Sequence, residues 1–205
     1  MNFYFLSKLN RMLRSVVSLN RKDEFKFILK YLNLNYQDSL LDVGSGDGYW
    51  TYKFANNCEE VIGVDPSNDL LALAKKHYKK ENLSFEYGSA EQLPYDNESF
   101  SKITSVSTIE HFENPIKGLG EMCRVLKNNG TLSISFDSLN NKNSSEKFRK
   151  WHSKKHYVNN YFTLDDIELI LNKNKMEMDK ECIFGIFKSR LSCFFRELFI
   201  KNPRK

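Results

Sequence analysis

The sequence predicts an α/β protein built around one doubly wound, mostly parallel sheet. Leu40, Leu41 and Val43 form a short apolar run of the length of a buried parallel strand, and it leads directly into glycines at positions 44, 46 and 48. Residues 61–65 (VIGVD) repeat this pattern of an apolar strand that ends in an acid. Strand-like and helix-like segments then follow one another along the chain, as in a sheet whose strands are joined by helices.

The remaining elements are expected from apolar periodicity and from helix caps. Further strands are predicted at residues 83–87, 102–106, 131–136 and 176–184. Helices are predicted at residues 5–17, 21–34, 49–57, 67–80, 114–126, from 163 onward and within 185–205. Ser67 is suited to cap one helix, and Thr163 with Asp166 forms a capping box for another. Asn128, Asn129 and Gly130 are expected to end the helix that precedes residue 131.

A chain of 205 residues fits a single domain with a substantial core. We expect residues 1–39 to form a helical cover and residues 40–136 the central ligand-binding core. Residues 137–205 would form a lid, the last strands and a C-terminal helix. The lid is expected to begin as a mobile loop, because the stretch after residue 137 is rich in Asn, Ser and Lys.

The glycine turn lies between the carboxyl end of a strand and the amino end of a helix, which is the crevice where open α/β sheets bind ligands. Gly44, Gly46 and Gly48 can adopt φ angles closed to other residues, and they let bare backbone N–H groups approach a ligand. A tight turn without a ligand is the plainer alternative.

Two carboxylates accompany this turn. Asp42 ends a buried strand, where an unpaired charge is costly, so a cation or a hydrogen-bond donor should meet it. Asp65 lies 21 residues after Gly44, the distance at which a carboxylate on the second strand binds ribose hydroxyls. A dinucleotide fingerprint would need its third glycine at position 49, which is Tyr49, so a nicotinamide enzyme is the least favoured alternative.

The pattern DxGxGxG resembles the first motif of the class I S-adenosylmethionine-dependent methyltransferases, in particular the type 11 methyltransferase domain. The resemblance covers about residues 40–136. It includes the segments LLDVGSGDG, VIGVDPS, GSAEQLPYDNESF, SVSTIEHF and EMCRVLKNNGTLSIS. It implies a Rossmann-like sheet of the seven-stranded type, S-adenosylmethionine as cofactor, and methyl transfer to a small-molecule, lipid or glycan acceptor.

The resemblance also implies where the cofactor would bind. Asp65 would hold the ribose, the strand end near Ser89 and Glu91 the adenine, and the backbone near Ser107 the methionine end. Ser89 stands where the family usually has an aspartate, so the adenine contact departs from the family pattern. The predicted cofactor-binding residues are Asp42, Gly44, Ser45, Gly46, Gly48, Asp65, Pro66, Ser89, Ala90, Glu91 and Ser107.

Methyl transfer asks little of protein side chains, because the sulfonium already activates the methyl group. Only an oxygen or a protonated nitrogen acceptor needs a base, and His111 is the first candidate, with His152 and His156 as the others. In the alternative view, Glu110 and His111 only orient their loop and cap the next helix. Residues 151–162 mix aromatic and basic side chains, which would suit an anionic or flat substrate or a lid that packs on the core.

The net charge of +5 is unevenly distributed, with a balance of −6 over residues 40–140, +4 before them and +7 after them. Basic flanks attract an anionic substrate, a phosphate-rich surface or RNA, although they also serve solubility. No RNA-binding module is recognisable, so an RNA or protein methyltransferase stays an alternative, as does a binding protein without turnover.

The chain is expected in the cytoplasm. Its four cysteines are far apart, with no CxxC pair and no metal-site spacing, and Lys8, Arg11 and Arg14 interrupt the apolar start that a signal peptide would need. The predicted first and last helices are amphipathic and flanked by Lys and Arg, so they would allow peripheral contact with an anionic membrane. The alternative is that both helices pack on the sheet or in a homodimer.

Overall fold

A computed structural model describes residues 19–137, 145–174, 176–185 and 194–201. The helix predicted at residues 5–17 lies outside this part of the chain. Residues 138–144 of the predicted loop and 186–193 of the predicted C-terminal helix also lie outside it.

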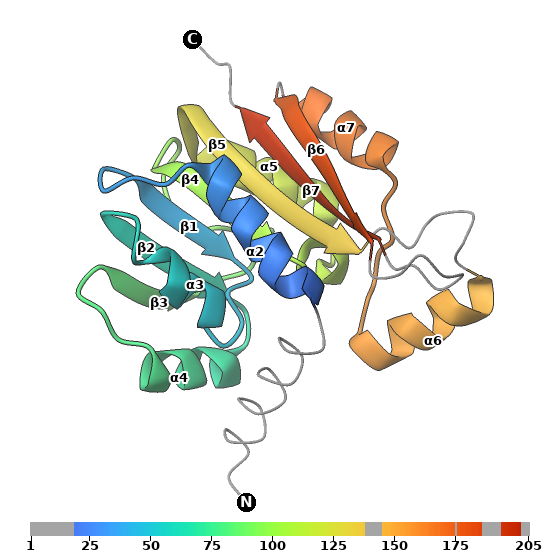
Figure 1. The fold of residues 1–205 in the computed structure, drawn as a ribbon, viewed down its shortest axis with the longest axis horizontal. Coiled ribbons are helices and arrows are strands. Elements are labelled where there is room, and N and C mark those ends of the chain that lie inside the picture. The colour runs from blue at the N-terminus through green and yellow to red at the C-terminus, as the bar shows by residue number, and fades with distance from the viewer. Residues whose placement is uncertain (1–18, 138–144, 175, 186–193, 202–205) are drawn as a thin grey trace, which may run out of the picture.

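The centre of the molecule is a sheet with the strand order β3-β2-β1-β4-β5-β7-β6 (Figure 1). The strands are β1 (Ser39–Val43), β2 (Glu60–Asp65), β3 (Leu83–Tyr87), β4 (Phe100–Val106), β5 (Leu126–Asp137), β6 (Glu177–Gly185) and β7 (Phe194–Lys201). The first five in the spatial order are parallel, and β7 runs antiparallel to both β5 and β6. The predicted doubly wound, mostly parallel sheet is confirmed, and each predicted strand is present.

Helices cover both faces of the sheet. They are α2 (Leu19–Leu32), α3 (Tyr49–Phe54), α4 (Asn68–His77), the short 3-10 helix η1 (Ile109–His111), α5 (Pro115–Val125), α6 (Glu146–His156) and α7 (Leu164–Lys173). In Figure 1, α2 and α3 lie in front of the sheet and α5 lies behind it. The predicted caps are confirmed: the Ser67 side chain accepts from the Leu70 N–H, and Thr163 and Asp166 form the capping box of α7.

The strand alternation divides the core between the two faces of the sheet. Leu41 and Val43 of β1 belong to the larger cluster, which includes buried residues of α5 and α7, whereas Leu40 belongs to the cluster with Ile28 of α2 and Phe54 of α3. Successive side chains of a strand point to opposite faces, so one strand supplies both clusters. This two-sided burial explains why apolar residues occupy consecutive as well as alternate positions of the strand, as Leu40, Leu41 and Val43 do.

Two expectations about the C-terminal part are corrected. The predicted C-terminal helix is wrong for residues 194–201, which form β7. Their apolar residues also fit helical spacing, but aromatic and β-branched residues favour strands, and β7 covers the edge that β5 would otherwise expose. The expected loop after residue 137 contains helix α6, which Ser145 caps by accepting from the Phe148 N–H. Its Glu, Lys and Arg residues are good helix formers, and it contains neither Gly nor Pro.

The turn expected at residues 128–130 also differs from the prediction. Helix α5 ends at Val125 and β5 begins at once, so Asn128, Asn129 and Gly130 lie within the strand's bounds. The β4–β5 register shifts there, because Phe100 pairs with Leu126 but the next pair joins residues 102 and 131. Asn129 has a φ of +60°, so the turn exists as an irregularity of the strand and not as a separate loop.

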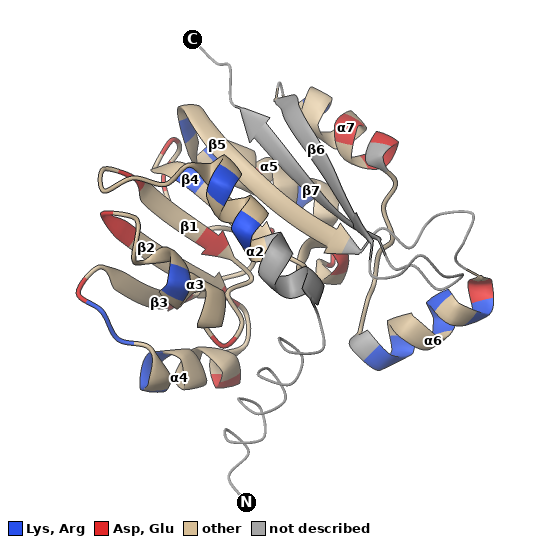
Figure 2. Ribbon diagram, viewed as in Figure 1, with Lys and Arg blue, Asp and Glu red and all other residues tan. Residues whose placement is uncertain are grey.

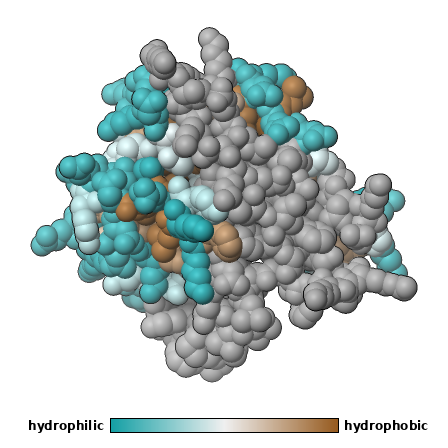
Figure 3. Space-filling view, turned by 45° about the horizontal axis from the view of Figure 1, so that its top comes forward, coloured by the Kyte–Doolittle hydropathy of each residue, from teal (hydrophilic) through white to brown (hydrophobic). Residues whose placement is uncertain are grey.

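The surface of the described residues has both charged and hydrophobic areas. Figure 2 shows Lys and Arg at several places along α6, which stands away from the sheet. On the face shown in Figure 3, hydrophilic residues lie above and below a hydrophobic area on the left.

Candidate functional site

The loops that follow β1 and β4 meet where the strand order reverses. The glycine loop follows β1, Ser107–His111 follows β4, and these two strands are neighbours in the sheet. A Cβ atom added to Gly44 would lie 2.1 Å from Cγ2 of Thr108, so the two loops are in direct contact. Open α/β sheets bind ligands at such a switch point, outside the carboxyl ends of the strands.

The three glycines of the loop serve different purposes, although each has a positive φ. A Cβ atom on Gly48 would lie 2.5 Å from the Phe85 ring, so this glycine allows close packing against β3. Gly44 similarly allows the contact with Thr108. A Cβ atom on Gly46 would meet nothing within 4 Å, so this glycine borders open space. Among the three, Gly46 is therefore the one that a ligand can approach.

The N–H groups of the loop are bonded within the protein. Those of Gly44 and Ser45 donate to the Val64 carbonyl at 2.8 and 3.0 Å, and that of Gly48 donates to the Ser45 carbonyl at 3.0 Å. The Gly46 N–H donates to Oδ2 of Asp65 at 2.8 Å. The expectation of bare N–H groups is therefore wrong at these four positions, and the end of β2 determines the shape of the loop.

Ser45 is buried and turned toward β2, since a Cβ atom on Gly63 would lie 2.8 Å from the Ser45 Cβ. Its hydroxyl has no hydrogen-bond partner among the described residues. A buried hydroxyl without a partner is unusual, and it lies in the same loop as the open space at Gly46.

Asp65 is buried at the end of β2 and is held on both sides. Its Oδ1 accepts from the Ser67 N–H at 2.9 Å, and its Oδ2 accepts from the Gly46 N–H. Each carboxylate oxygen has a second lone pair, so the group keeps the capacity to accept from ribose hydroxyls. Pro66 is exposed beside it. The ribose role of Asp65 stays a prediction.

Asp42 is fully enclosed beneath the loop. Its Oδ2 accepts from the Thr51 hydroxyl at 2.7 Å, so the hydrogen-bonding partner expected from the sequence is Thr51 of α3. Burial raises the pKa of Asp42 to about 7; the Thr51 hydrogen bond opposes this rise, and the charge of Asp65 adds to it. At neutral pH this carboxyl group therefore titrates.

The predicted adenine contacts are engaged with each other and with the start of α5. Oε1 of Glu91 accepts from the N–H groups of Glu113 and Asn114 at 3.0 and 3.2 Å, and Oε2 accepts from the Ser89 hydroxyl. Burial works to raise the pKa of Glu91, but the hydrogen bonds from Ser89 and Asn114 outweigh it and lower the pKa. Ala90, between them, is buried. Glu91 thus joins the loop after β3 to the loop after η1, and its adenine role stays a prediction.

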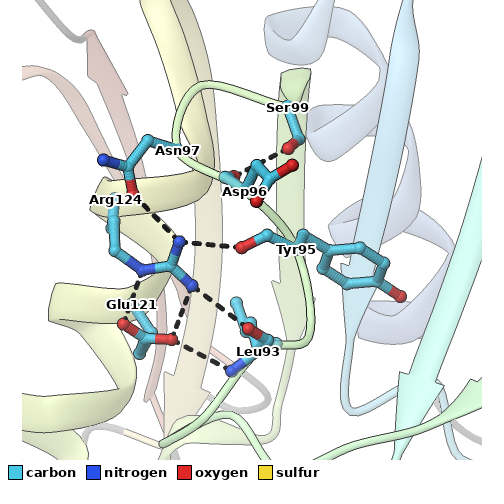
Figure 4. Close-up of polar contacts among 7 residues, drawn as sticks. All are labelled: Leu93, Tyr95, Asp96, Asn97, Ser99, Glu121 and Arg124. Carbon is cyan, nitrogen blue, oxygen red and sulfur yellow. Dashed lines mark hydrogen bonds and ion pairs between the residues drawn. The ribbon is translucent and has the colours of Figure 1, made fainter.

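Arg124 of α5 holds the segment that follows Ser89–Glu91 (Figure 4). All five of its N–H donors are used: two bond Glu121, and the others bond the Leu93 carbonyl, the Tyr95 carbonyl and Oδ1 of Asn97 at 2.8 to 3.1 Å. Glu121 in turn accepts from the Leu93 N–H at 3.0 Å. Our sequence analysis missed this cluster, in which only the i, i+3 spacing of Glu121 and Arg124 is visible.

Ser107 begins the loop after β4 in an unusual conformation. Its φ is +51°, which non-glycine residues seldom adopt and which is common at functional sites. Its N–H donates to the carbonyl and to the hydroxyl of Ser135, both at 3.0 Å. The bend at Ser107 brings Thr108 onto the glycine loop. Its predicted contact with the cofactor stays a prediction.

His111 is exposed at the end of η1. Its Nδ1 lies 3.0 Å from the Tyr157 carbonyl, at the C-terminal end of α6. A carbonyl oxygen only accepts, so Nδ1 carries a proton in this contact, and Nε2 is the acceptor nitrogen of the neutral ring. The ring is thus oriented with its basic nitrogen directed away from Tyr157.

Two asparagines that our sequence analysis missed attach the segment after α6 to the η1 loop. The N–H groups of Asn159 and Asn160 both donate to the Glu110 carbonyl, at 2.9 and 3.0 Å. Their side-chain amides donate to the carbonyls of His111 and Phe112, at 2.9 and 2.8 Å. These four bonds fix the backbone on both sides of the His111 ring.

The other two candidate bases are placed differently. His152 is buried, and its Nδ1 lies 3.3 Å from the Tyr161 hydroxyl, which donates to the Arg149 carbonyl. Burial, followed by the charges of His111 and Lys155, lowers the pKa of His152. His152 is thus part of the packing of α6. The side chain of His156 lies outside the described part of the structure.

Comparison with known proteins gives a family match at this site. Residues 41–134 match the methyltransferase domain family. The uncharacterized methyltransferase YcgJ of Bacillus subtilis is 31% identical over 111 residues, which cover 53% of this chain and 44% of YcgJ. The demethylmenaquinone methyltransferase of Shouchella clausii is 31% identical over 137 residues, 63% of this chain and 58% of that protein. The chain spans about half the length of these curated relatives.

Solved structures share the fold across most of the chain. The crystal structure of YcgJ has a TM-score of 0.72 at 17% identity and covers 88% of this chain and 97% of that one. The Haemonchus contortus phosphoethanolamine N-methyltransferase 2, in complex with S-adenosyl-L-methionine, has a TM-score of 0.75 at 17% identity and covers 89% of this chain and 53% of that one. At these identities the likeness shows the fold.

The parallel sheet with a glycine loop at its switch point is thus a Rossmann-like fold, which the chain shares with solved methyltransferase structures. The chain is thus similar to the methyltransferase domain family through residues 41–134, and the phosphoethanolamine N-methyltransferase 2 that shares its fold binds S-adenosyl-L-methionine. The open space at Gly46 and the remaining lone pairs of Asp65 fit such a cofactor. None of the helices in the described part of the chain has the length and apolar character of a membrane span.

Proposed function

We propose that the protein transfers a methyl group from S-adenosylmethionine to a small-molecule or lipid acceptor. One observation carries this proposal: Gly46 borders open space at the point where the glycine loop, Asp65 and the loop after β4 meet. Glycines at the same turn that are needed for packing, Gly44 and Gly48, have no such space. The glycine loop is therefore closely packed at Gly44 and Gly48 and open to a ligand at Gly46.

The residues of this site have distinct tasks in the proposed function. Asp65 would accept from the ribose hydroxyls, and Ser89, Ala90 and Glu91 would line the adenine. Ser107 would hold the methionine end beside the glycine loop. The cofactor, when bound, supplies a methyl group that its sulfonium has already activated. The protein's part is to align the acceptor and exclude water.

His111 is the proposed base for an oxygen or protonated nitrogen acceptor. Its ring is exposed beside the site, and the Tyr157 carbonyl holds the proton on Nδ1, so Nε2 is the atom that would take a proton from the acceptor. In the alternative role, His111 only orients its loop. The bonds from Asn159 and Asn160 go to backbone carbonyls, so the loop has supports that do not depend on the imidazole.

The names of relatives bear on the acceptor. Two matched proteins are a demethylmenaquinone methyltransferase and a ubiquinone/menaquinone biosynthesis C-methyltransferase, at 31% and 29% identity. These names favour a small, ring-containing or lipid acceptor over RNA or protein. We further propose a cytoplasmic location, peripheral contact with an anionic membrane and a homodimer.

Calorimetric titration with S-adenosylmethionine and with NAD tests the cofactor site. Wild-type protein should bind the first and not the second. Gly46→Val should abolish binding, because a branched side chain would occupy the open space. Valine is strained at a φ of +55°, so Gly46→Asn provides a second test, since asparagine tolerates this conformation but also fills the space.

Gly120→Val is the matched control, because a Cβ atom there would make only an ordinary 3.5 Å contact with Asn174. It should bind the cofactor like the wild type. Unchanged affinity in a folded Gly46→Asn variant would contradict the proposed site. Binding without turnover across oxygen, nitrogen and carbon acceptors would favour the non-catalytic alternative.

A further inference from the structure

Helix α6 presents a stripe of lysines around one exposed tryptophan. Lys147, Lys150, Trp151 and Lys154 are all exposed and follow the spacing i, i+3, i+4 and i+7, so they share one helix face. Lys155, also exposed, places its Nζ 4.6 Å from the centroid of the Trp151 ring. Residues 146–156 contain five Lys or Arg and one acid, Glu146.

The opposite side of α6 carries its attachment to the protein. His152 and Val158 are buried, and the segment after the helix is bonded to the η1 loop through Asn159 and Asn160. Figure 1 shows α6 standing away from the sheet, and Figure 2 shows its basic residues along its length. The lysine stripe is therefore a convex outer surface and not part of the core.

We infer that the α6 stripe is a docking surface for an acidic lipid bilayer. Trp151 is 51% exposed and Tyr157, at the end of the helix, is 82% exposed, and such amphipathic rings are favoured where lipid headgroups meet water. Flexible lysine stems keep their ammonium groups near anionic headgroups while their methylenes lie along apolar surface. The positive stripe and the negative leaflet are complementary in charge.

Two other anionic partners fit the stripe less well. A small ligand needs a concave site, and the stripe is convex. Nucleic acids favour arginine forks and a ring face on which a base can stack. All the cations of the stripe are lysines, and the Trp151 ring already has Lys155 over it and Phe148 at a centroid distance of 5.6 Å. An extended anionic surface that accepts the edge of the ring is the better match.

The position of α6 gives the docking a consequence at the site. Tyr157 ends the helix and its carbonyl is bonded to the His111 ring, so a docked α6 brings the His111 side of the site next to the bilayer. This consequence, which rests on the proposed function, points to an acceptor taken from the membrane. The docking itself requires no turnover, so a failure of methyl transfer and a failure of docking are separate results.

Sedimentation of the full-length protein with vesicles tests the docking. Phosphatidylcholine vesicles with and without phosphatidylglycerol would be compared at about 0.1 M and about 1 M salt, where the Debye length falls from about 10 Å to about 3 Å. The protein should bind the acidic vesicles at the lower salt only. Each lysine near such a surface strengthens binding about fivefold, so Lys150→Gln with Lys154→Gln should weaken it roughly 25-fold.

The matched control is Lys127→Gln with Lys173→Gln. Both lysines are exposed, and they lie at the start of β5 and at the end of α7, at the other end of the sheet from α6 (Figure 1). This pair removes the same charge but should change vesicle binding far less. Equal weakening by the two pairs would show that total charge, and not the stripe, drives binding, and would overturn the proposal.

Tryptophan fluorescence gives an independent readout. The chain has two tryptophans, so Trp50→Phe leaves Trp151 as the single reporter. Its emission should shift to shorter wavelength with acidic vesicles and stay unchanged with neutral ones. An unchanged emission with acidic vesicles would overturn the docking. Loss of binding to a short single-stranded RNA in the Lys150 and Lys154 double variant, with vesicle binding retained, would also overturn it and assign the stripe to nucleic acid.

Discussion

Asp42→Asn should stabilise the protein at alkaline pH and leave its stability almost unchanged near pH 4. Asp42 is enclosed beneath the glycine loop with one hydroxyl donor, that of Thr51 at 2.7 Å. Burial raises its pKa from 3.8 to about 7. Asparagine has nearly the same shape, is neutral at every pH, and its carbonyl oxygen can accept the same hydrogen bond.

The sign follows from the proton balance. Between pH 3.8 and about 7 the folded protein keeps the Asp42 proton while the unfolded chain has lost it. Stability from this group is therefore fully present below the unfolded pKa, and it is lost as the pH rises through the folded pKa. Each pKa unit corresponds to about 1.4 kcal/mol of folding free energy. The rise of the Asp42 pKa to about 7 therefore lowers the free energy of unfolding by roughly 4 kcal/mol above pH 7, relative to its value in acid.

Urea unfolding of both proteins, followed by circular dichroism at a series of pH values, measures this difference. The free energy of unfolding of Asp42→Asn should exceed that of the wild type by an amount that grows from near zero at about pH 4 to roughly 4 kcal/mol at about pH 8. A difference that does not change with pH, or a wild type that is more stable at pH 8, would refute the reasoning.

Asp166→Asn provides a contrast of opposite sign. Hydrogen bonds from the side chain and the N–H of Thr163 lower the pKa of Asp166, against a small effect of burial. Its stabilisation is present above the unfolded pKa and is lost as the pH falls through the folded pKa. Asp166→Asn should therefore lower the stability at pH 7 and lose this effect in acid. The two variants together separate a local effect at each carboxyl group from a general effect of net charge.

Three further predictions concern the site. Asp65→Ala should weaken S-adenosylmethionine binding by about 1.5 to 3 kcal/mol in calorimetry, because it removes a charged acceptor, and an unchanged affinity would rule out the ribose role. His111→Ala should lower kcat for an oxygen or protonated nitrogen acceptor while the cofactor Kd stays nearly constant; parallel losses in both would indicate a structural role. Arg124→Met should lower the free energy of unfolding by about 2 kcal/mol in urea, because Glu121 and the segment from Leu93 to Asn97 lose their shared donor. A variant as stable as the wild type would show that this cluster contributes little.

The predictable parts of the fold are those determined by neighbouring residues. The strand before Gly44 is buried on both faces, so it appears in the sequence as an apolar run, and the caps at Ser67 and Thr163 act within three residues. The exception is β7, whose apolar residues fit a helix and a strand equally well. Its conformation depends on pairing with β5, which is distant in the sequence.

The unpredictable parts of the site depend on contacts between distant segments. Arg124 bonds residues about 30 positions earlier, and Asn159 bonds the Glu110 carbonyl 49 positions earlier. A glutamate and an arginine three residues apart, or two consecutive asparagines, are common on any surface. Only the folded chain shows which carbonyls lie within their reach. For the same reason the sequence could name His111 as a base but could not assign its proton to Nδ1.

Contacts run without a break from the glycine loop to α6, and they limit how the site can change. Thr108 lies against Gly44 and hydrogen-bonds the Val106 carbonyl, and the next three residues form η1. The carbonyls of η1 and of Phe112 are in turn bonded by Asn159 and Asn160. A displacement of α6 must therefore break these bonds or move η1 and, with it, the side chain packed on Gly44. Because that packing is close, these bonds favour one position of η1 and of the end of α6 relative to the glycine loop.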